Sequence, residues 1–277
     1  MRFCFRNRFL DFDGNTLIMG ILNVTPDSFS DGGECSCVED AVSKAGRLLE
    51  EGAVIVDIGG ESTRPGFTAV SPDEEISRVV PVVSGIRAKY GEEPIVSVDT
   101  SKAEVAEAAL AVGADIVNDV SALEIGGVPM CEAIGKYHAG CILMHPRGVP
   151  QGSEPMEAIA SYLAGRLEYA MENTGLDRNF FAVDPGIGFG KDLEQNLRCC
   201  VDYSQLRKLA RPILIGISRK SSLGLVTGRT VDCREYATVA STAIAAYLGA
   251  DILRVHNVSA NKDAVSVAKA LRESTMK

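Results

Sequence analysis

Eight short apolar runs recur along the chain, and each ends at polar or charged residues before a stretch with helical character. The runs cover residues 17–23, 54–60, 95–99, 115–120, 141–145, 181–184, 213–220 and 251–256. Strands that are buried on both faces have this composition, and repeated strand and helix units are typical of a parallel barrel. The sequence therefore predicts the α/β class and a single (β/α)8 TIM barrel, with its chemistry at the carboxyl ends of the strands.

Helical segments and turns are expected between these runs. The helical segments are residues 38–51, 73–90, 102–111, 130–138, 154–174, 192–209, 235–248 and 260–274. Ser71 and Pro72 are typical of a helix start, and Gly52 and Gly113 stand where a helix end needs a left-handed residue. We expect one domain over residues 1–277, in which residues 1–16 form a hairpin, turning at residues 13–14, that caps the bottom of the barrel.

Composition and charge exclude several classes of protein. The formal net charge of −9 argues against a nucleic-acid partner, because a phosphate backbone requires a clustered basic surface. None of the eight cysteines has the paired spacing of a zinc site, so we expect reduced thiols in a cytoplasmic protein. No segment reaches the ~20 apolar residues of a membrane span, and the N-terminus lacks the apolar stretch of a signal peptide.

Polar residues near the ends of the runs share a strand face with residues earlier in the same run. Alternation groups Ile95 with Ser97 and Asp99, Gly216 with Ser218 and Lys220, and Ile252 with Arg254 and His256. Burying such charges costs several kcal/mol per ion unless each finds a partner. Two interpretations remain: a site for a polar ligand in the barrel mouth, or an internal network of ion pairs that closes the barrel top.

Three loops have compositions that suit contact with a ligand. The connections 24–37 and 59–72 are long and rich in Gly, Ser and Asp, which suits loops that cover a substrate. Arg64 in the second loop, together with Arg254 and His256, is typical of an anion clamp. The glycine-rich stretch 186–192 has Asp192 where a Walker loop needs Ser or Thr, so we interpret it as a tight turn that lets backbone approach a ligand.

Seven strings, in order along the chain, resemble dihydropteroate synthase, a bacterial folate-pathway family of pterin-binding TIM-barrel enzymes. They are IMGILNVTPDSFSDGG, DIGGESTRPG, SVDTSK, VNDVSA, DPGIGFGKD, IGISRKSSLG and RVHNV, and they span residues 18–258. The resemblance implies a transferase that joins 6-hydroxymethyl-7,8-dihydropterin pyrophosphate to p-aminobenzoate and releases pyrophosphate, with Mg2+ as cofactor. It also implies a homodimer formed through the last helices, and competition by sulfonamides, which mimic p-aminobenzoate.

Carried onto this chain, the resemblance assigns residues to the parts of this reaction. The catalytic positions are Asp99, Lys220 and Arg254. The pterin is expected to contact Asp99, Asn118, Met144, Asp184, Gly216 and Lys220. The p-aminobenzoate pocket is expected to consist of Phe29, Thr63, Pro65, Phe189, Ser218 and Lys220. Pyrophosphate is expected at Thr63, Arg64, Arg254 and His256, and Mg2+ at Asn23 and Asp31.

The implied reaction breaks the C–O bond first, and the arylamine then captures the pterin methylene cation beside Asp99. It needs no protein nucleophile, so none of the cysteines is expected to be essential. Residues 143–151 depart from the family pattern at Pro146 and Val149. Two alternatives stay open: a methyltransferase of similar barrel that uses methyltetrahydrofolate and a corrinoid partner, and a paralogue that binds pterin without turnover. The two long loops favour the synthase, because methyl transfer needs neither an arylamine pocket nor a pyrophosphate clamp.

Overall fold

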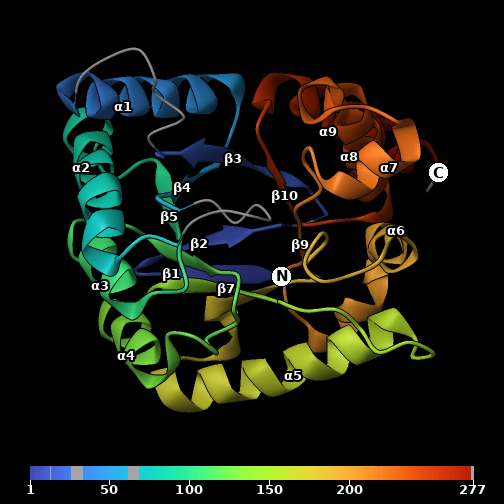
Figure 1. Cartoon of the computed structure of the whole chain (residues 1–277), viewed down its shortest axis with the longest axis horizontal. Helices are drawn as coiled ribbons and strands as arrows, with labels where there is room; N and C mark the ends of the chain where they lie inside the picture. Colours follow the sequence, from blue (N-terminus) through green and yellow to red (C-terminus); the bar gives the residue numbers. More distant parts are fainter. Residues whose placement is uncertain (13, 26–33, 62–68, 276–277) are drawn as a thin grey trace.

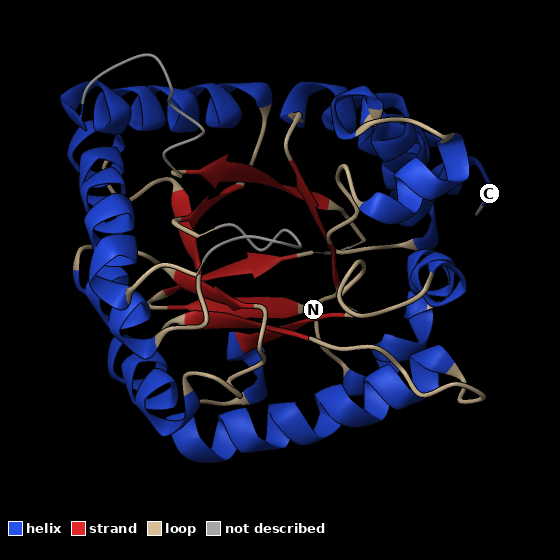
Figure 2. Ribbon diagram, viewed as in Figure 1, coloured by secondary structure: helices blue, strands red, loops and turns tan. Residues whose placement is uncertain are grey.

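A computed structural model of the chain describes residues 1–12, 14–25, 34–61 and 69–275. Within these ranges, eight parallel strands form a barrel surrounded by helices, as predicted (Figures 1 and 2). The strands are β3 (Leu17–Asn23), β4 (Ile55–Gly59), β5 (Ile95–Asp99), β6 (Ile116–Asp119), β7 (Gly140–Met144), β8 (Phe181–Asp184), β9 (Leu214–Ile215) and β10 (Ile252–Val255). They are paired in the order β8-β7-β6-β5-β4-β3-β10-β9, and a parallel bridge between Val183 and Ile213 joins the two ends of the sheet.

Helices cover the outside of the barrel. They are α1 (Glu34–Glu51), α2 (Pro72–Tyr90), α3 (Ala103–Ala111), α4 (Gly127–Tyr137), α5 (Pro155–Thr174), α6 (Leu193–Val201), α7 (Ser221–Thr227), α8 (Glu235–Leu248) and α9 (Val258–Thr275). The start of α2 is as predicted, because Ser71 Oγ accepts the main-chain N–H of Glu74 at 3.2 Å. Gly52 and Gly113 follow α1 and α3 closely, and their φ values of 107° and 112° are positive, as expected there. No helix in the described part of the chain is long and apolar enough to cross a bilayer.

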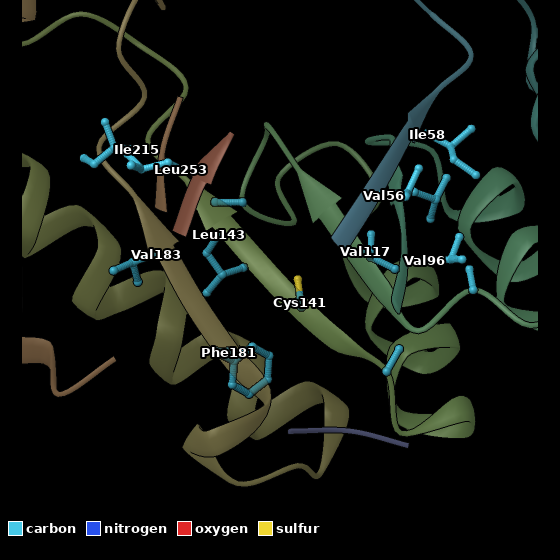
Figure 3. Close-up of a cluster of buried hydrophobic side chains, with 14 of the residues drawn as sticks. Val56, Ile58, Val96, Val117, Cys141, Leu143, Phe181, Val183, Ile215 and Leu253 are labelled. Atoms are coloured by element: carbon cyan, nitrogen blue, oxygen red, sulfur yellow. The ribbon is translucent and has the colours of Figure 1, made fainter. Parts of the chain in front are cut away.

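Strand alternation divides the core into two layers. Residues that face outward pack against the helices, and Figure 3 labels Val56, Ile58, Val96, Val117, Cys141, Leu143, Phe181, Val183, Ile215 and Leu253. Residues that face inward form a separate buried cluster, with Met19, Ile55, Ile95, Ile116, Ile142, Ala182, Leu214 and Ile252. Both faces of each strand are therefore buried, which explains why the strands appear in the sequence as nearly continuous apolar runs.

The N-terminal hairpin is formed by β1 (Arg2–Phe5) and β2 (Arg8–Asp11), but its turn is not the predicted one. The chain reverses at Arg6 and Asn7, whereas Gly14 follows β2 and Asp13 lies outside the described residues. Arg6 has a positive φ of 50°, and its guanidinium donates to the main-chain oxygen of Ala114 at 2.8 Å. This tether to the barrel, rather than an Asp-Gly pair, fixes the reversal.

The hairpin packs its aromatic side chains into the barrel. Phe3, Phe5 and Phe12 are buried in the inner cluster, together with inward residues of the parallel strands. Because that cluster includes the early residues Ile55 and Ile95 of their strands, the hairpin fills the amino end of the barrel.

The seventh apolar run and the sixth helical segment depart most from the prediction. The strand expected over residues 213–220 covers only β9, and the chain then turns, with Arg219 at a φ of 58°, before α7 begins at Ser221. Ser218 and Lys220 therefore lie on a turn and do not continue the alternation of Gly216. The helix expected over residues 192–209 ends at Val201 and is followed by a 3-10 helix, Tyr203–Leu209.

Candidate active site

A cavity of about 530 Å³ opens at the carboxyl ends of the strands. All the described residues that the sequence analysis assigned to the site line it: Asn23, Asp99, Asn118, Met144, Asp184, Phe189, Gly216, Ser218, Lys220, Arg254 and His256. The other assigned residues lie outside the described part of the chain: Phe29, Asp31, Thr63, Arg64 and Pro65. The barrel thus brings together side chains from strands and loops that are far apart in the sequence.

The parallel register explains why the strand residues meet. Asn23 is paired with Gly59, Gly59 with Asp99, and Asp99 with Asn118. Because these strands end at the same level, their last inward-facing side chains meet at the carboxyl-terminal opening of the barrel. Gly59 leaves space between its neighbours, since a Cβ there would lie 3.7 Å from both Asn23 Oδ1 and Asp99 Cβ.

Arg254 makes the main charge contacts of the site. Its Nε donates to Asp57 Oδ2 at 2.6 Å, and its Nη2 donates to Asp99 Oδ2 at 2.5 Å. Asp57 Oδ2 also accepts from Asn118 Nδ2 at 3.1 Å, and the Asp57 side chain is fully buried. The sequence analysis gave Asp57 no role, although alternation with Ile55 places this lone acid on the inward face.

The electrostatics of this group follow from its burial. Burial raises the pKa of Asp99 to about 7 against the opposing effect of Arg254, and Asp57 adds to the increase. Burial would lower the pKa of Arg254, but Asp57 and Asp99 raise it above its usual value, so the guanidinium stays charged. The buried charges were interpreted either as a site for a polar ligand or as an internal network of ion pairs. Both interpretations hold in part, because Arg254 forms ion pairs and these charges also line a cavity.

Asp184 and Lys220 supply a second pair of charges. Asp184 Oδ1 accepts the N–H of Gly186 at 2.7 Å, and a Cβ at Gly216 would be 3.8 Å from Oδ2. Burial raises the pKa of Asp184 and lowers that of Lys220 to about 8. Lys220 Nζ lies 4.3 Å from the centre of the Phe189 ring, in a cation–π contact.

Ser218 contacts His256 in the cavity. Ser218 Oγ accepts the main-chain N–H of His256 at 3.3 Å and lies 2.8 Å from His256 Nδ1. Because Oγ accepts this N–H, its own proton is free to point toward Nδ1, in which case Ser218 is the donor of the side-chain contact. Ser218, which the resemblance places with p-aminobenzoate, thus also contacts a residue assigned to pyrophosphate.

Several lining residues were not foreseen. Glu61, Arg219 and Arg234 border the cavity. Glu61 Oε2 accepts from Lys102 Nζ at 3.1 Å, and the main-chain oxygen of Arg219 accepts from Arg234 Nη1 at 3.0 Å. These side chains stand on loops or at helix starts, where no periodicity in the sequence indicates which way a residue faces.

Donors for a metal ion are few among the described residues. They include no group of three or more His, Cys, Asp or Glu side chains that fits a metal, although Asn23 lines the cavity. Mg2+ normally keeps several waters and combines one or two protein ligands with phosphate oxygens of the substrate. Of the two residues predicted to bind Mg2+, Asn23 lines the cavity, and Asp31 lies outside the described residues.

Cys141 and Cys199 are two of the three cysteines buried among the described residues, the third being Cys131. Cys141 and Cys199 are buried in the outer core layer and do not line the cavity. Burial raises the pKa of Cys141 well above its usual value and that of Cys199 to about 12. Both therefore remain thiols at neutral pH, which agrees with a site that uses no cysteine nucleophile.

Comparisons with known proteins agree with this geometry. A family model described as "Pterin binding enzyme" matches residues 19–256. A dihydropteroate synthase of Streptococcus pyogenes serotype M6 is 42% identical over 261 residues, which cover 94% of this chain and 97% of that protein. A solved structure of Xanthomonas albilineans dihydropteroate synthase with 4-aminobenzoic acid has a TM-score of 0.88 and 43% identity, covering 96% of each chain. Another, in complex with 7,8-dihydropteroate, has a TM-score of 0.86 and 40% identity, covering 97% of this chain and 99% of that one. The chain belongs to the dihydropteroate synthase family of pterin binding enzymes.

Proposed function

We propose that the cavity joins 6-hydroxymethyl-7,8-dihydropterin pyrophosphate to p-aminobenzoate, giving 7,8-dihydropteroate and pyrophosphate. The observation that carries this proposal is that acids suited to a pterin and cations suited to a diphosphate line one cavity, represented by Asp184 and Arg254. The similar Xanthomonas protein has been solved with 4-aminobenzoic acid and with 7,8-dihydropteroate, which supports the same substrates here.

The pterin is assigned to the strand side of the cavity. The amino-pyrimidine edge of a pterin offers adjacent N–H donors, and Asp184 Oδ2 is available as an acceptor because Gly186 contacts Oδ1. Lys220 donates to the ring oxygen and nitrogen, and Asn118 contacts the same ring. Met144 and Gly216 flank its faces, where Gly216 leaves space in front of Asp184.

The pyrophosphate is assigned to Arg254 and His256, with Thr63 and Arg64 of the second long loop. Cations there stabilise the charge that develops when the C–O bond breaks and its electron pair passes to the diphosphate. The methylene cation is stabilised by the ionised form of Asp99. The arylamine nitrogen captures it and then loses a proton.

The p-aminobenzoate is assigned to Phe189, Ser218 and Lys220, with Phe29, Thr63 and Pro65 from the long loops. Mg2+ is proposed to bind at Asn23 and Asp31, where it would neutralise charge on the diphosphate.

Competition by sulfonamides follows from their likeness to p-aminobenzoate. Location in the cytoplasm also stays a prediction.

A homodimer through the last helices is proposed as well. Figure 1 shows α7, α8 and α9 gathered at one corner of the molecule, where α8 packs on α9. Large apolar side chains on α8 and α9 are exposed, and such residues mark contact surfaces when they gather. They are Tyr236, Ile244, Tyr247, Leu248, Val267 and Leu271.

The experiment that tests the function is a coupled assay of pyrophosphate release that depends on p-aminobenzoate. We expect Asp99→Asn, Lys220→Ala and Arg254→Ala each to lower kcat/KM by about 100-fold or more, as loss of transition-state contacts does. Lys136→Ala is the control for Lys220→Ala, because Lys136 is an exposed residue of α4. A methyltransferase would release no pyrophosphate, and a silent paralogue would bind the pterin pyrophosphate in a calorimeter without forming product.

A further inference from the structure

One half-buried lysine, Lys191, joins the loops that follow β7 and β8. The three N–H donors of Lys191 Nζ are shared among the main-chain oxygens of Gly186 at 2.8 Å, Arg147 at 3.0 Å, and His145 and Phe189 at 3.3 Å. Nζ also lies 3.1 Å from His145 Nδ1. These acceptors come from both loops, so one ammonium group holds them together. Lys191 is not among the described residues that line the cavity, and the proposed mechanism does not use it.

The two loops are packed backbone against backbone around this contact. A Cβ at Gly148 would clash with the main-chain oxygen of Gly190, and one at Gly186 would clash with that of His145. Gly186 and Gly190 also have positive φ values of 72° and 64°. Side-chain packing between the loops is therefore replaced by hydrogen bonds from Lys191.

His145 acts in this group as a neutral acceptor. Burial lowers its pKa to about 4, with Lys191 as the next cause, so the imidazole is uncharged at neutral pH and Nδ1 accepts from the ammonium. Its ring packs edge-on against Tyr162, with the ring centres 4.9 Å apart, which fixes its orientation. Burial lowers the pKa of Lys191 to about 8, so the lysine keeps its proton at neutral pH.

The loop after β8 carries one side of the proposed p-aminobenzoate pocket. Phe189 and Gly188 line the cavity, and a Cβ at Gly188 would lie only 2.9 Å from Lys220 Cδ. A shift of the turn would therefore move Phe189 and weaken its cation–π contact with Lys220, which stands on a separate turn before α7. The pterin acids depend less on the turn, because Asp99 and Asp184 stand on strands held by the sheet, and only Asp184 also accepts an N–H from it, that of Gly186.

We propose that Lys191 is a positioning residue for p-aminobenzoate recognition, acting through the main-chain oxygens of Gly186 and Phe189. This inference rests on the proposed function and deepens it. It separates the two substrates, because loss of the lysine should disturb the arylamine pocket much more than the pterin pocket.

The test is a comparison of KM for each substrate in Lys191→Met, Lys191→Arg, Gly148→Ala and the wild type. We expect Lys191→Met to raise KM for p-aminobenzoate about tenfold while KM for the pterin pyrophosphate stays within about twofold. Lys191→Arg should recover part of the loss, because a guanidinium also donates to several oxygens. Gly148→Ala forces the loops apart without removing the lysine, and should repeat the selective increase.

Lys136→Met is the matched control, since Lys136 is exposed on α4, where it pairs with Glu107 at 2.5 Å. An unchanged KM for p-aminobenzoate in folded Lys191→Met, or equal increases of both KM values, would overturn the inference. If thermal melting shows that Lys191→Met does not fold, the same criteria are applied to Gly148→Ala and Lys191→Arg. A wild-type chain without p-aminobenzoate-dependent pyrophosphate release would instead refute the proposed function.

Discussion

At the scale of single residues, Asp57 holds two groups of the site in place. It accepts from Arg254 and from Asn118 through the same carboxylate oxygen. We expect Asp57→Asn to lower kcat/KM about tenfold or more, because Arg254 loses one of its two ionic partners and part of what orients it. Asp57→Ala should also reduce the free energy of unfolding by about 3–5 kcal/mol, since it leaves a buried guanidinium half-paired.

Kinetics and chemical denaturation of these variants measure both effects. Asp73→Asn, at an exposed acid in the first turn of α2, is the control and should change neither value substantially. Wild-type kcat/KM in Asp57→Asn would show that Arg254 does not depend on this carboxylate.

We expect the ionisation of Asp99 and Lys220 to set the pH dependence of activity. The pKa of Asp99 is raised to about 7, so its charged form is lost as the pH falls through that value. The pKa of Lys220 is lowered to about 8, so the ammonium is lost as the pH rises through that value. We expect kcat/KM for the pterin pyrophosphate to follow a narrow bell, highest between these two values. Asp99→Asn should remove the acid limb, and a flat wild-type profile would contradict the assignment.

Sequence alone brought many site residues together because they stand at the ends of strands. Asp99 and Asp184 are the last residues of β5 and β8, and the barrel fixes where such side chains point. Asp57 acts through residues far away in the sequence, and Lys191 joins nearby main-chain oxygens to those of a loop 44 and 46 residues away. Nothing local indicates such a partner, so no pattern in the chain predicts these roles.

At the scale of elements, the sequence predicted the strands of the barrel correctly, but it placed the end of the seventh strand too late. The seventh run includes only two residues of strand, because the chain turns after Ile215 and starts a helix of seven residues. Ile217 continues the apolar pattern of the run beyond Ile215, so the sequence does not indicate where the strand ends and the turn begins. Lys220 nevertheless lines the cavity, as predicted. The prediction relied on alternation along a strand, whereas in the structure a turn places this residue.

The hairpin offers a prediction about stability. Phe3 is fully buried at the amino end of the barrel, whereas Phe9 of the same hairpin is 52% exposed. We expect Phe3→Ala to lower the free energy of unfolding by about 3–5 kcal/mol, the cost of a large cavity in a core. Phe9→Ala should cost well under half as much, and kcat should survive in both variants, because the hairpin lies at the other end of the barrel from the cavity. Equal losses of stability in urea denaturation would contradict this packing.

At the scale of the whole molecule, the exposed apolar residues of the last helices lead to a prediction about assembly. We expect a sedimentation mass of twice the chain mass of 29.5 kDa. Ile244→Glu on α8 should shift the protein toward monomer, because it places a charge in the proposed interface. Ile125→Glu is the control, at another exposed isoleucine outside these helices. A wild-type chain that sediments as a monomer at micromolar concentration would refute the dimer.

The central claim is that one barrel mouth holds a pterin beside the cations that remove its diphosphate. The most direct measurement quantifies 7,8-dihydropteroate and pyrophosphate formed by the purified chain from the pterin pyrophosphate and p-aminobenzoate. We predict equal amounts of the two products, and almost none of either from Arg254→Ala. Pyrophosphate without dihydropteroate, or neither product from the wild-type chain, would contradict the claim.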